Sequence, residues 1–171
     1  MDTNIIRQKA DRKDFFPLSV LLVLFCLRVA GQLLVVLYQV PFLPPMQEWQ
    51  SGLLPYSVLL ALQVLIIGTF IKVCRDFYAQ DGFFYEAKAA LAEPLMTFGK
   101  AYVVLNAVRL LIWQTAFGHH IWFAGIIPIV FHFVLASFLI IVAAHHRKEL
   151  IRRTSALNAV LNDLQPQAIK Q

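Results

Sequence analysis

Four long stretches of the chain carry almost only apolar side chains, and shorter polar segments separate them. They run from about residue 15 to 40, 53 to 73, 95 to 117 and 121 to 144. Each has the ~20 residues that a helix needs to cross the hydrocarbon core of a bilayer. Their apolar residues form continuous runs without alternation, which favours helices over the strands of a closed barrel. The pattern predicts an all-α fold, an integral membrane four-helix bundle formed by a single domain, residues 1–171.

The basic residues indicate how these stretches are oriented. They lie before the first stretch, around the connection between the second and third, and after the fourth: Arg7, Lys9, Arg12, Lys13, Lys72, Arg75, Lys88, Lys100, Arg147, Lys148, Arg152 and Arg153. The connections at 41–52 and 118–120 contain no Lys or Arg. By the positive-inside rule, both termini and the middle connection are cytoplasmic. Trp49, Trp113 and Trp122 then fall at the opposite interface, as expected for an aromatic belt.

The segments outside the apolar stretches have patterns of their own. The proline-rich connection at 41–52 predicts an ordered cap or a re-entrant turn, because proline stiffens the backbone. The middle connection at 76–93 is rich in aromatic residues, and we expect an interfacial helix at the cytoplasmic headgroups, with a docking surface for a partner as the alternative. Leu150, Leu157 and Leu164 recur at heptad spacing, which predicts an amphipathic helix over 147–164. A surface helix is favoured over a dimerising one.

Composition agrees with a membrane protein and argues against a nucleic-acid binder. The chain is 59% hydrophobic and 15% charged, with a net charge of +5. Soluble domains carry about 25% charged residues. Because the positive charges lie at the edges of the apolar stretches, they fit anionic headgroups better than a phosphate backbone. The two cysteines, Cys26 and Cys74, fall at different expected depths and form no CxxC motif, so we expect neither a disulfide nor thiol relay chemistry.

Two arginines lie inside the apolar stretches, Arg28 in the first and Arg109 in the third. A charge at mid-helix costs about 3 kcal/mol on insertion scales. Gln32 follows Arg28 by four residues and Asn106 precedes Arg109 by three, so each arginine shares a helix face with an amide. No Asp or Glu lies in any of the stretches, so the partners left for the arginines are Gln63, Gln114, Asn106, backbone carbonyls, water or a group from outside the chain. The arginines could therefore hold an external anion, such as a lipid phosphate, a carboxylate, a quinone carbonyl or an acid of another subunit. Alternatively, they reach the outer interface or join the first and third helices through amides.

Histidines raise the question of a haem. His132 and His146 lie fourteen residues apart on the fourth stretch, and cytochrome b-type subunits space their haem ligands in this way. Bis-histidine ligation needs histidines at matching depths on a second helix, and the first three stretches contain none. We therefore do not expect haem, and we expect hydrogen-bonded or interfacial histidines. A structural metal site also lacks its close-set Cys and His residues, so we expect no metal.

The sequence nominates no catalytic residue, because it contains no P-loop, GxGxxG, GxSxG or HExxH motif. The layout resembles that of small four-helix membrane proteins of bacteria, and we expect the bacterial inner membrane. The interpretation we favour is a protein that acts by association, as an accessory subunit or homo-oligomer, and binds an anionic lipid or a small anion. Its partners would be the lipid bilayer and a membrane protein, with no nucleic acid. Its candidate ligand-binding residues are Arg28, Gln32, Asn106, Arg109 and His132.

Two other functions stay open. The first is a redox or lipid-modifying membrane enzyme with a quinone, haem or lipid pocket built from the same five residues. The second is a small-anion transporter, because arginines within membrane helices often mark a pathway.

The charge pattern makes a topological prediction. In a variant that lacks Cys26 and Cys74, single cysteines introduced near each terminus should both react with a membrane-impermeant thiol reagent from the cytoplasmic side. Accessibility in intact cells and in inside-out vesicles measures this directly. Labelling of the two termini from opposite sides would contradict an even number of spans.

Overall fold

The computed structural model of the chain describes residues 13–38, 40, 42–49, 54–117 and 126–168. These residues form the helices α2 (Phe15–Tyr38), α3 (Met46–Trp49), α4 (Tyr56–Ala79), α5 (Ala89–Phe117) and α6 (Ile126–Ala168) and contain no strand. Four of the helices, α2, α4, α5 and α6, are long and apolar enough to cross a membrane. The predicted all-α fold with four apolar helices is confirmed.

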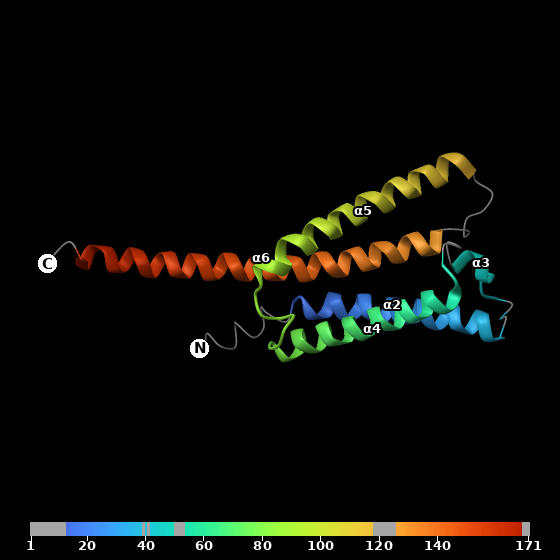
Figure 1. Ribbon diagram of the computed structural model, residues 1–171, viewed down its shortest axis with the longest axis horizontal. Helices are drawn as coiled ribbons and strands as arrows, with labels where there is room; N and C mark the ends of the chain where they lie inside the picture. The colour runs from blue at the N-terminus through green and yellow to red at the C-terminus, as the bar shows by residue number, and fades with distance from the viewer. Residues whose placement is uncertain (1–12, 39, 41, 50–53, 118–125, 169–171) are drawn as a thin grey trace.

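The helix α6 is the element around which the others are arranged. It packs against α5, α2 and α3, and α2 packs against α4 on the other side of the bundle, as Figure 1 shows. The aromatic ring of Phe70 on α4 stacks on that of Phe138 on α6, with 3.5 Å between centroids and 4° between planes. Leu18, Phe77 and Val142 complete a core contributed by α2, α4 and α6.

Large apolar side chains also cover the outside of the bundle. Leu27 on α2, Leu65 on α4 and Leu105 on α5 are each more than 60% exposed, and many others resemble them. A monomeric soluble protein rarely exposes a contiguous apolar surface of this kind. The outer faces of these helices therefore have the chemistry of surfaces that contact hydrocarbon.

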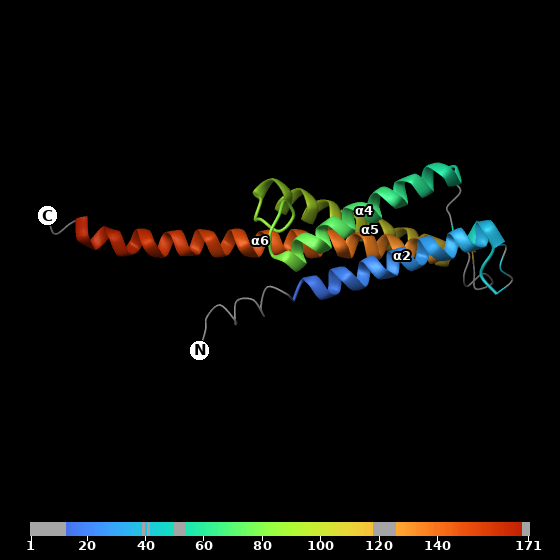
Figure 2. The same cartoon turned by 90° about the horizontal axis from the view of Figure 1, so that it is seen from below.

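The bundle has a compact end and an open end. At the basic end, where Lys72, Arg75 and Lys88 gather around the α4–α5 connection, α5 packs closely on α6 because Gly99 has no side chain. A Cβ at Gly99 would lie 2.7 Å from Cγ1 of Ile140. Toward the cap end, where α3 lies, α5 diverges from α6 (Figure 1) and α4 diverges from α2 (Figure 2).

The connection between α4 and α5 is a folded turn, so the expected interfacial helix over 76–93 is wrong. The helix α4 continues past the predicted end at residue 73 to Ala79, and α5 begins at Ala89 rather than at 95. Between them, Gln80 and Gly82 adopt positive φ angles, 57° and 101°, which end the helix. The buried carboxylate of Asp76 then accepts a hydrogen bond from the backbone N–H of Phe84 at 3.2 Å. This acceptor holds the turn against α4.

The amphipathic segment over 147–164 is not a separate surface helix, because α6 runs without a break for 43 residues. The chain contains neither Pro nor Gly from 129 to 165, so nothing in the sequence interrupts the helix. The carboxylate of Glu149 pairs with Arg152 at 2.8 Å and with Arg153 at 3.2 Å along the same helix. The C-terminal half of α6 projects beyond the other helices (Figure 1). Residues 121–125 of the fourth predicted span lie outside the described residues.

His145 connects three parts of the chain at the basic end. Its Nδ1 lies 3.4 Å from Oδ2 of Asp14, just before α2, and its Nε2 lies 3.1 Å from the carbonyl oxygen of Tyr85. The hydrogen bond from His145 is the main cause that lowers the pKa of Asp14. These contacts hold the start of α2 and the α4–α5 turn against α6.

The α4–α5 turn yields a stability prediction. Gly82→Ala should destabilise the protein by about 1 to 3 kcal/mol, because the residue has a positive φ and its Cβ would lie 2.8 Å from Cγ of Asp76. Thermal unfolding of the full chain in detergent measures the effect.

Gly68→Ala is the matched control, since nothing lies within 4 Å of a Cβ at that exposed helical position. It should leave stability unchanged or raise it by up to about 1 kcal/mol. Equal unfolding temperatures for the two variants would contradict the structure of the turn.

Candidate functional site

Arg28 is buried in the middle of α2. It lies thirteen residues after the start of the helix, which is about 20 Å along its axis, and it is 9% exposed. Its Nη2 donates a hydrogen bond to the carbonyl oxygen of Trp49 at 3.1 Å, and its guanidinium carbon lies 5.2 Å from the centroid of the Phe131 ring. The guanidinium of Arg28 is therefore held within the bundle by the connection that carries Trp49 and by α6.

The described part of the proline-rich connection, residues 42–49, folds as a cap on the bundle, which is one of the two forms that the sequence predicts. The short helix α3 contacts both α2 and α6. The side chain of Trp49 is buried, and its Nε1 donates to the carbonyl oxygen of Pro44 at 2.9 Å. The Trp49 ring fits against Gly31, where a Cβ would lie 2.8 Å from Cη2 of the indole. This close contact brings the Trp49 carbonyl within reach of Arg28, one turn earlier on α2.

Two buried amides join α2 to α4. The Nε2 of Gln63 donates to Oε1 of Gln32 at 2.9 Å, and both side chains are at most 2% exposed. The sequence suggested amide bonds between the first and third spans; the structure places this one between the first and second. Nε2 of Gln32, Oε1 of Gln63 and Nε of Arg28 have no hydrogen-bond partner in the part of the chain that the structure describes. Buried polar groups are rarely left without one, so these atoms indicate a place for a water molecule or a ligand.

A cavity of about 300 Å³ opens next to these groups, at the end of the bundle where the helices diverge. Its polar lining consists of Arg28, Gln63, Tyr102, Arg109 and His132, and its apolar lining includes Phe25, Leu59, Leu62, Ile66, Phe131 and Leu135. Arg28, Arg109 and His132, which come from three different helices, therefore meet at one site. Gln32 lies behind Gln63, outside the lining, and Asn106 faces an adjoining groove.

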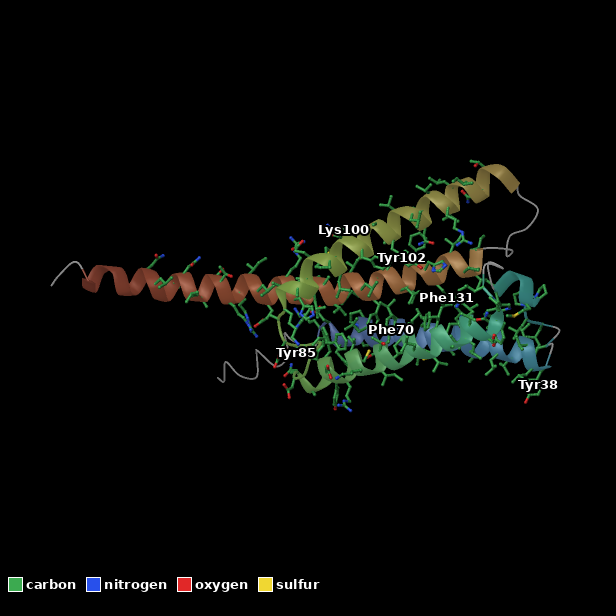
Figure 3. The ribbon with its side chains drawn as sticks, in the orientation of Figure 1. Tyr38, Phe70, Tyr85, Lys100, Tyr102 and Phe131 are labelled. Atoms are coloured by element: carbon green, nitrogen blue, oxygen red, sulfur yellow. The ribbon has the colours of Figure 1, made fainter. Side chains whose placement is uncertain are left out.

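Tyr102 and His132 link α5 to α6 beside the cavity. The hydroxyl oxygen of Tyr102 lies 2.6 Å from Nδ1 of His132, and the two rings meet edge to face. Figure 3 shows Tyr102 in the space between the two helices and Phe131 on the side of α6 toward α2 and α4. The Nδ2 of Asn106 donates to the carbonyl oxygen of Tyr102, so this amide bonds within its own helix.

A second, shallower groove of about 560 Å³ adjoins the cavity on the surface of α5. It shares Tyr102, Arg109 and His132 with the cavity, and its other lining residues are Leu105, Asn106, Val108 and Ile112. The two spaces are therefore neighbours, one inside the bundle and one on its apolar outer face.

The electrostatics of the cavity are dominated by the two arginines. Arg109 is partly exposed and makes no hydrogen bond or ion pair with the described residues. No Asp or Glu occurs among the described residues of the lining. A charge removed from water without a partner is unfavourable, so an anion in the cavity would be strongly stabilised.

The lining limits what the site can do chemically. Its described polar groups are two guanidiniums, an amide, a phenol and an imidazole, with no thiol or carboxylate among them. The described residues also contain no group of three or more His, Cys, Asp or Glu that could hold a metal ion. The arrangement is that of a set of hydrogen-bond donors around an apolar space, which suits binding of an oxygen-rich anion.

Sequence reasoning missed Tyr102 and Phe131 and underrated Gln63. Tyr102 precedes Arg109 by seven residues and Asn106 by four, so helical periodicity puts all three on one face of α5. Gln63 is the sole amide in its span, a signal that was present. Nothing in the sequence indicated that the Trp49 carbonyl would accept a hydrogen bond from Arg28, because a backbone contact across the bundle depends on how the cap folds.

No family model, curated protein or solved structure matches the chain.

The cap yields a prediction about the site. Gly31→Ala should displace the Trp49 ring, because the new methyl group would overlap it. In a background with Trp113 and Trp122 replaced by Phe, the fluorescence of Trp49 should shift to the red and be quenched more readily by acrylamide. Gly68→Ala in the same background should leave the emission unchanged. Unchanged emission in Gly31→Ala would mean that the cap does not rest on α2.

Proposed function

We propose that this chain is an integral membrane protein that binds the anionic group of an amphiphile in the cavity between its helices. It acts by association, as an accessory subunit or a homo-oligomer, rather than by catalysis. The observation that carries the proposal is that Arg28 and Arg109 line one cavity with no carboxylate among its described residues. Both cations therefore line a largely apolar space in which no described carboxylate balances their charge.

Magnitudes favour an anion over the alternatives for these arginines. Two unit charges 4 Å apart attract by about 4 kcal/mol at the effective dielectric constant of 20 that suits partly buried sites. Before the anion's own desolvation is counted, that attraction is similar in size to the cost of about 3 kcal/mol of placing one arginine at mid-span. A neutral carbonyl, such as that of Trp49, compensates less, since hydrogen bonds to charged groups contribute about 1.5 to 3 kcal/mol.

The apolar part of the lining supports an amphiphile over a small soluble anion. Leu59, Leu62 and Ile66 of α4 face the cavity opposite α5, and α5 packs chiefly against α6 alone. A fully hydrated anion would gain nothing from these side chains, whereas an acyl or other hydrocarbon chain would be sheltered by them.

The charge pattern supports a location and an orientation. Basic residues gather at the end of the bundle that carries the α4–α5 turn and the C-terminal half of α6, and this end would face the cytoplasm of a bacterium across its inner membrane. Both termini would then be cytoplasmic. The cavity, nearer the cap end, would lie at the depth of the outer leaflet.

A partner would have two surfaces to use. The outer face of α5 exposes Val104, Leu105 and Leu111, and the projecting part of α6 exposes Ile151, Leu157 and Leu161. Association of α5 with a second membrane helix and of α6 with a second helix outside the membrane would cover both.

The proposal is tested by lipid binding of charge-removing variants. Arg109→Gln and Arg28→Gln should each weaken retention of anionic lipids by about 10- to 100-fold in native mass spectrometry of the detergent-purified chain, because each removes a charge-assisted hydrogen bond. Lys100→Gln is the matched control, since Lys100 also lies on α5, is exposed and does not line the cavity. If all three variants retain anionic lipids as the parent does, the cavity is not an anion site.

A further inference from the structure

We propose, building on the proposed function, that the ligand is a lipid phosphate monoester, a dianion, rather than a lipid with a single negative charge. Arg28 and Arg109 contribute two positive charges to the cavity, and its described lining contributes no negative one. The occupied site is neutral only when the ligand carries two negative charges. A phosphate monoester carries about −1.5 to −2 near neutral pH, whereas a phosphodiester or a carboxylate carries one.

The hydrogen-bonding groups at the cavity match the three terminal oxygens of a monoester, all of which are acceptors. Nε of Arg28 is buried without a partner, and the guanidinium of Arg109 has none among the described residues. The amide of Gln63 is buried at the same wall, and its Oε1 has no partner among the described residues. The amide oxygen and nitrogen of Gln63 can exchange positions if those of Gln32 do so too, which keeps the hydrogen bond between the two side chains. Gln63 then presents an N–H to the cavity.

The Tyr102–His132 pair supplies a further donor. A hydroxyl carries one proton, and a histidine nitrogen either donates or accepts according to the tautomer. When Nδ1 of His132 carries the proton, it donates to the Tyr102 oxygen across the 2.6 Å contact. The phenolic proton of Tyr102 is then free for a ligand oxygen. An anion that accepts the phenolic proton favours this tautomer, because in the other tautomer Tyr102 donates that proton to Nδ1 of His132.

The adjoining groove has room for the hydrocarbon part of the same molecule. It meets the cavity at Tyr102, Arg109 and His132 and continues along Leu105, Val108 and Ile112. These three apolar side chains are 64%, 46% and 59% exposed on the outer face of α5. A headgroup in the cavity and a chain in the groove would thus belong to one lipid that enters from the side, without leaving the bilayer.

The experiment compares two lipids that differ in the ester state of the phosphate. Native mass spectrometry of the full chain in detergent would measure the affinity for phosphatidic acid and for phosphatidylglycerol with the same acyl chains. Phosphatidic acid should bind at least about tenfold more tightly, because the diester leaves one guanidinium uncompensated. This preference should vanish in Arg109→Gln and persist in Lys100→Gln. Glycerol 3-phosphate, the soluble headgroup, should not displace the bound lipid at equal concentration.

The outcomes separate this inference from the proposed function. Equal affinity for both lipids, lost in Arg109→Gln, would leave an anionic-lipid site and overturn the dianion. Displacement by glycerol 3-phosphate at equal concentration would overturn the lipid and identify a soluble phosphate monoester. Binding that is unchanged in Arg109→Gln would overturn both proposals.

Arg109→Gln is the deciding variant because its effect on folding should be small. Arg109 is partly exposed and contacts no described residue through a hydrogen bond, whereas Arg28 is buried and holds the cap. Thermal unfolding of Arg109→Gln should match that of Lys100→Gln. If Arg28→Gln fails to fold, the lipid preference of Arg109→Gln still decides between the outcomes.

Discussion

The burial of the Arg28 guanidinium is the constraint on which the cap half of this protein depends. A cation in an apolar bundle needs oxygen atoms and polarisable surface around it. The chain supplies one carbonyl oxygen, from Trp49, and one aromatic face, from Phe131. Both depend on further features: the Trp49 carbonyl reaches α2 because Gly31 leaves space for the indole, and Phe131 faces Arg28 because α6 packs against α2. Even so, Nε of Arg28 has no partner among the described residues, so their contacts compensate the charge incompletely.

The contrast between the two ends of the bundle explains why the cavity lies where it does. At the basic end the helices pack closely. The ring of Phe70 on α4 stacks on that of Phe138 on α6, and Gly99 on α5 leaves room for the side chain of Ile140 on α6. At the cap end, the long side chains of Arg28 and Arg109 occupy positions where compact apolar residues would let the helices close. Two like charges also repel each other in a medium of low dielectric constant. The cavity lined by Arg28 and Arg109 accordingly lies at this end of the bundle.

The sequence predicted the parts of the fold that depend on local chemistry. Uninterrupted apolar runs located all four long helices, and the prolines of residues 41–45 indicated an ordered cap. Two expectations were wrong. The carboxylate of Asp76 accepts a hydrogen bond from the backbone N–H of Phe84 and holds a turn where we expected an interfacial helix. No Pro or Gly follows Ala144 until residue 166, so α6 continues as one long helix. At the site, the arginines and His132 were evident because polar residues are rare in such spans. Which of them would meet could not be inferred, because that depends on the angles between helices, which tertiary packing sets.

The position of Tyr102 relates the closed end of the bundle to the open one. It lies one turn after Gly99, where α5 packs closely on α6, and its bond to His132 ties the two helices together there. One turn further along α5, Asn106 bonds to its own helix, and Arg109 has no hydrogen-bonded partner among the described residues. Among the described residues, the Tyr102–His132 contact is therefore the last hydrogen bond between α5 and α6 toward the cap end, and it lies at the cavity. A group that binds between the arginines would contact both sides of this tie, because Tyr102 and His132 line the same cavity as Arg28 and Arg109.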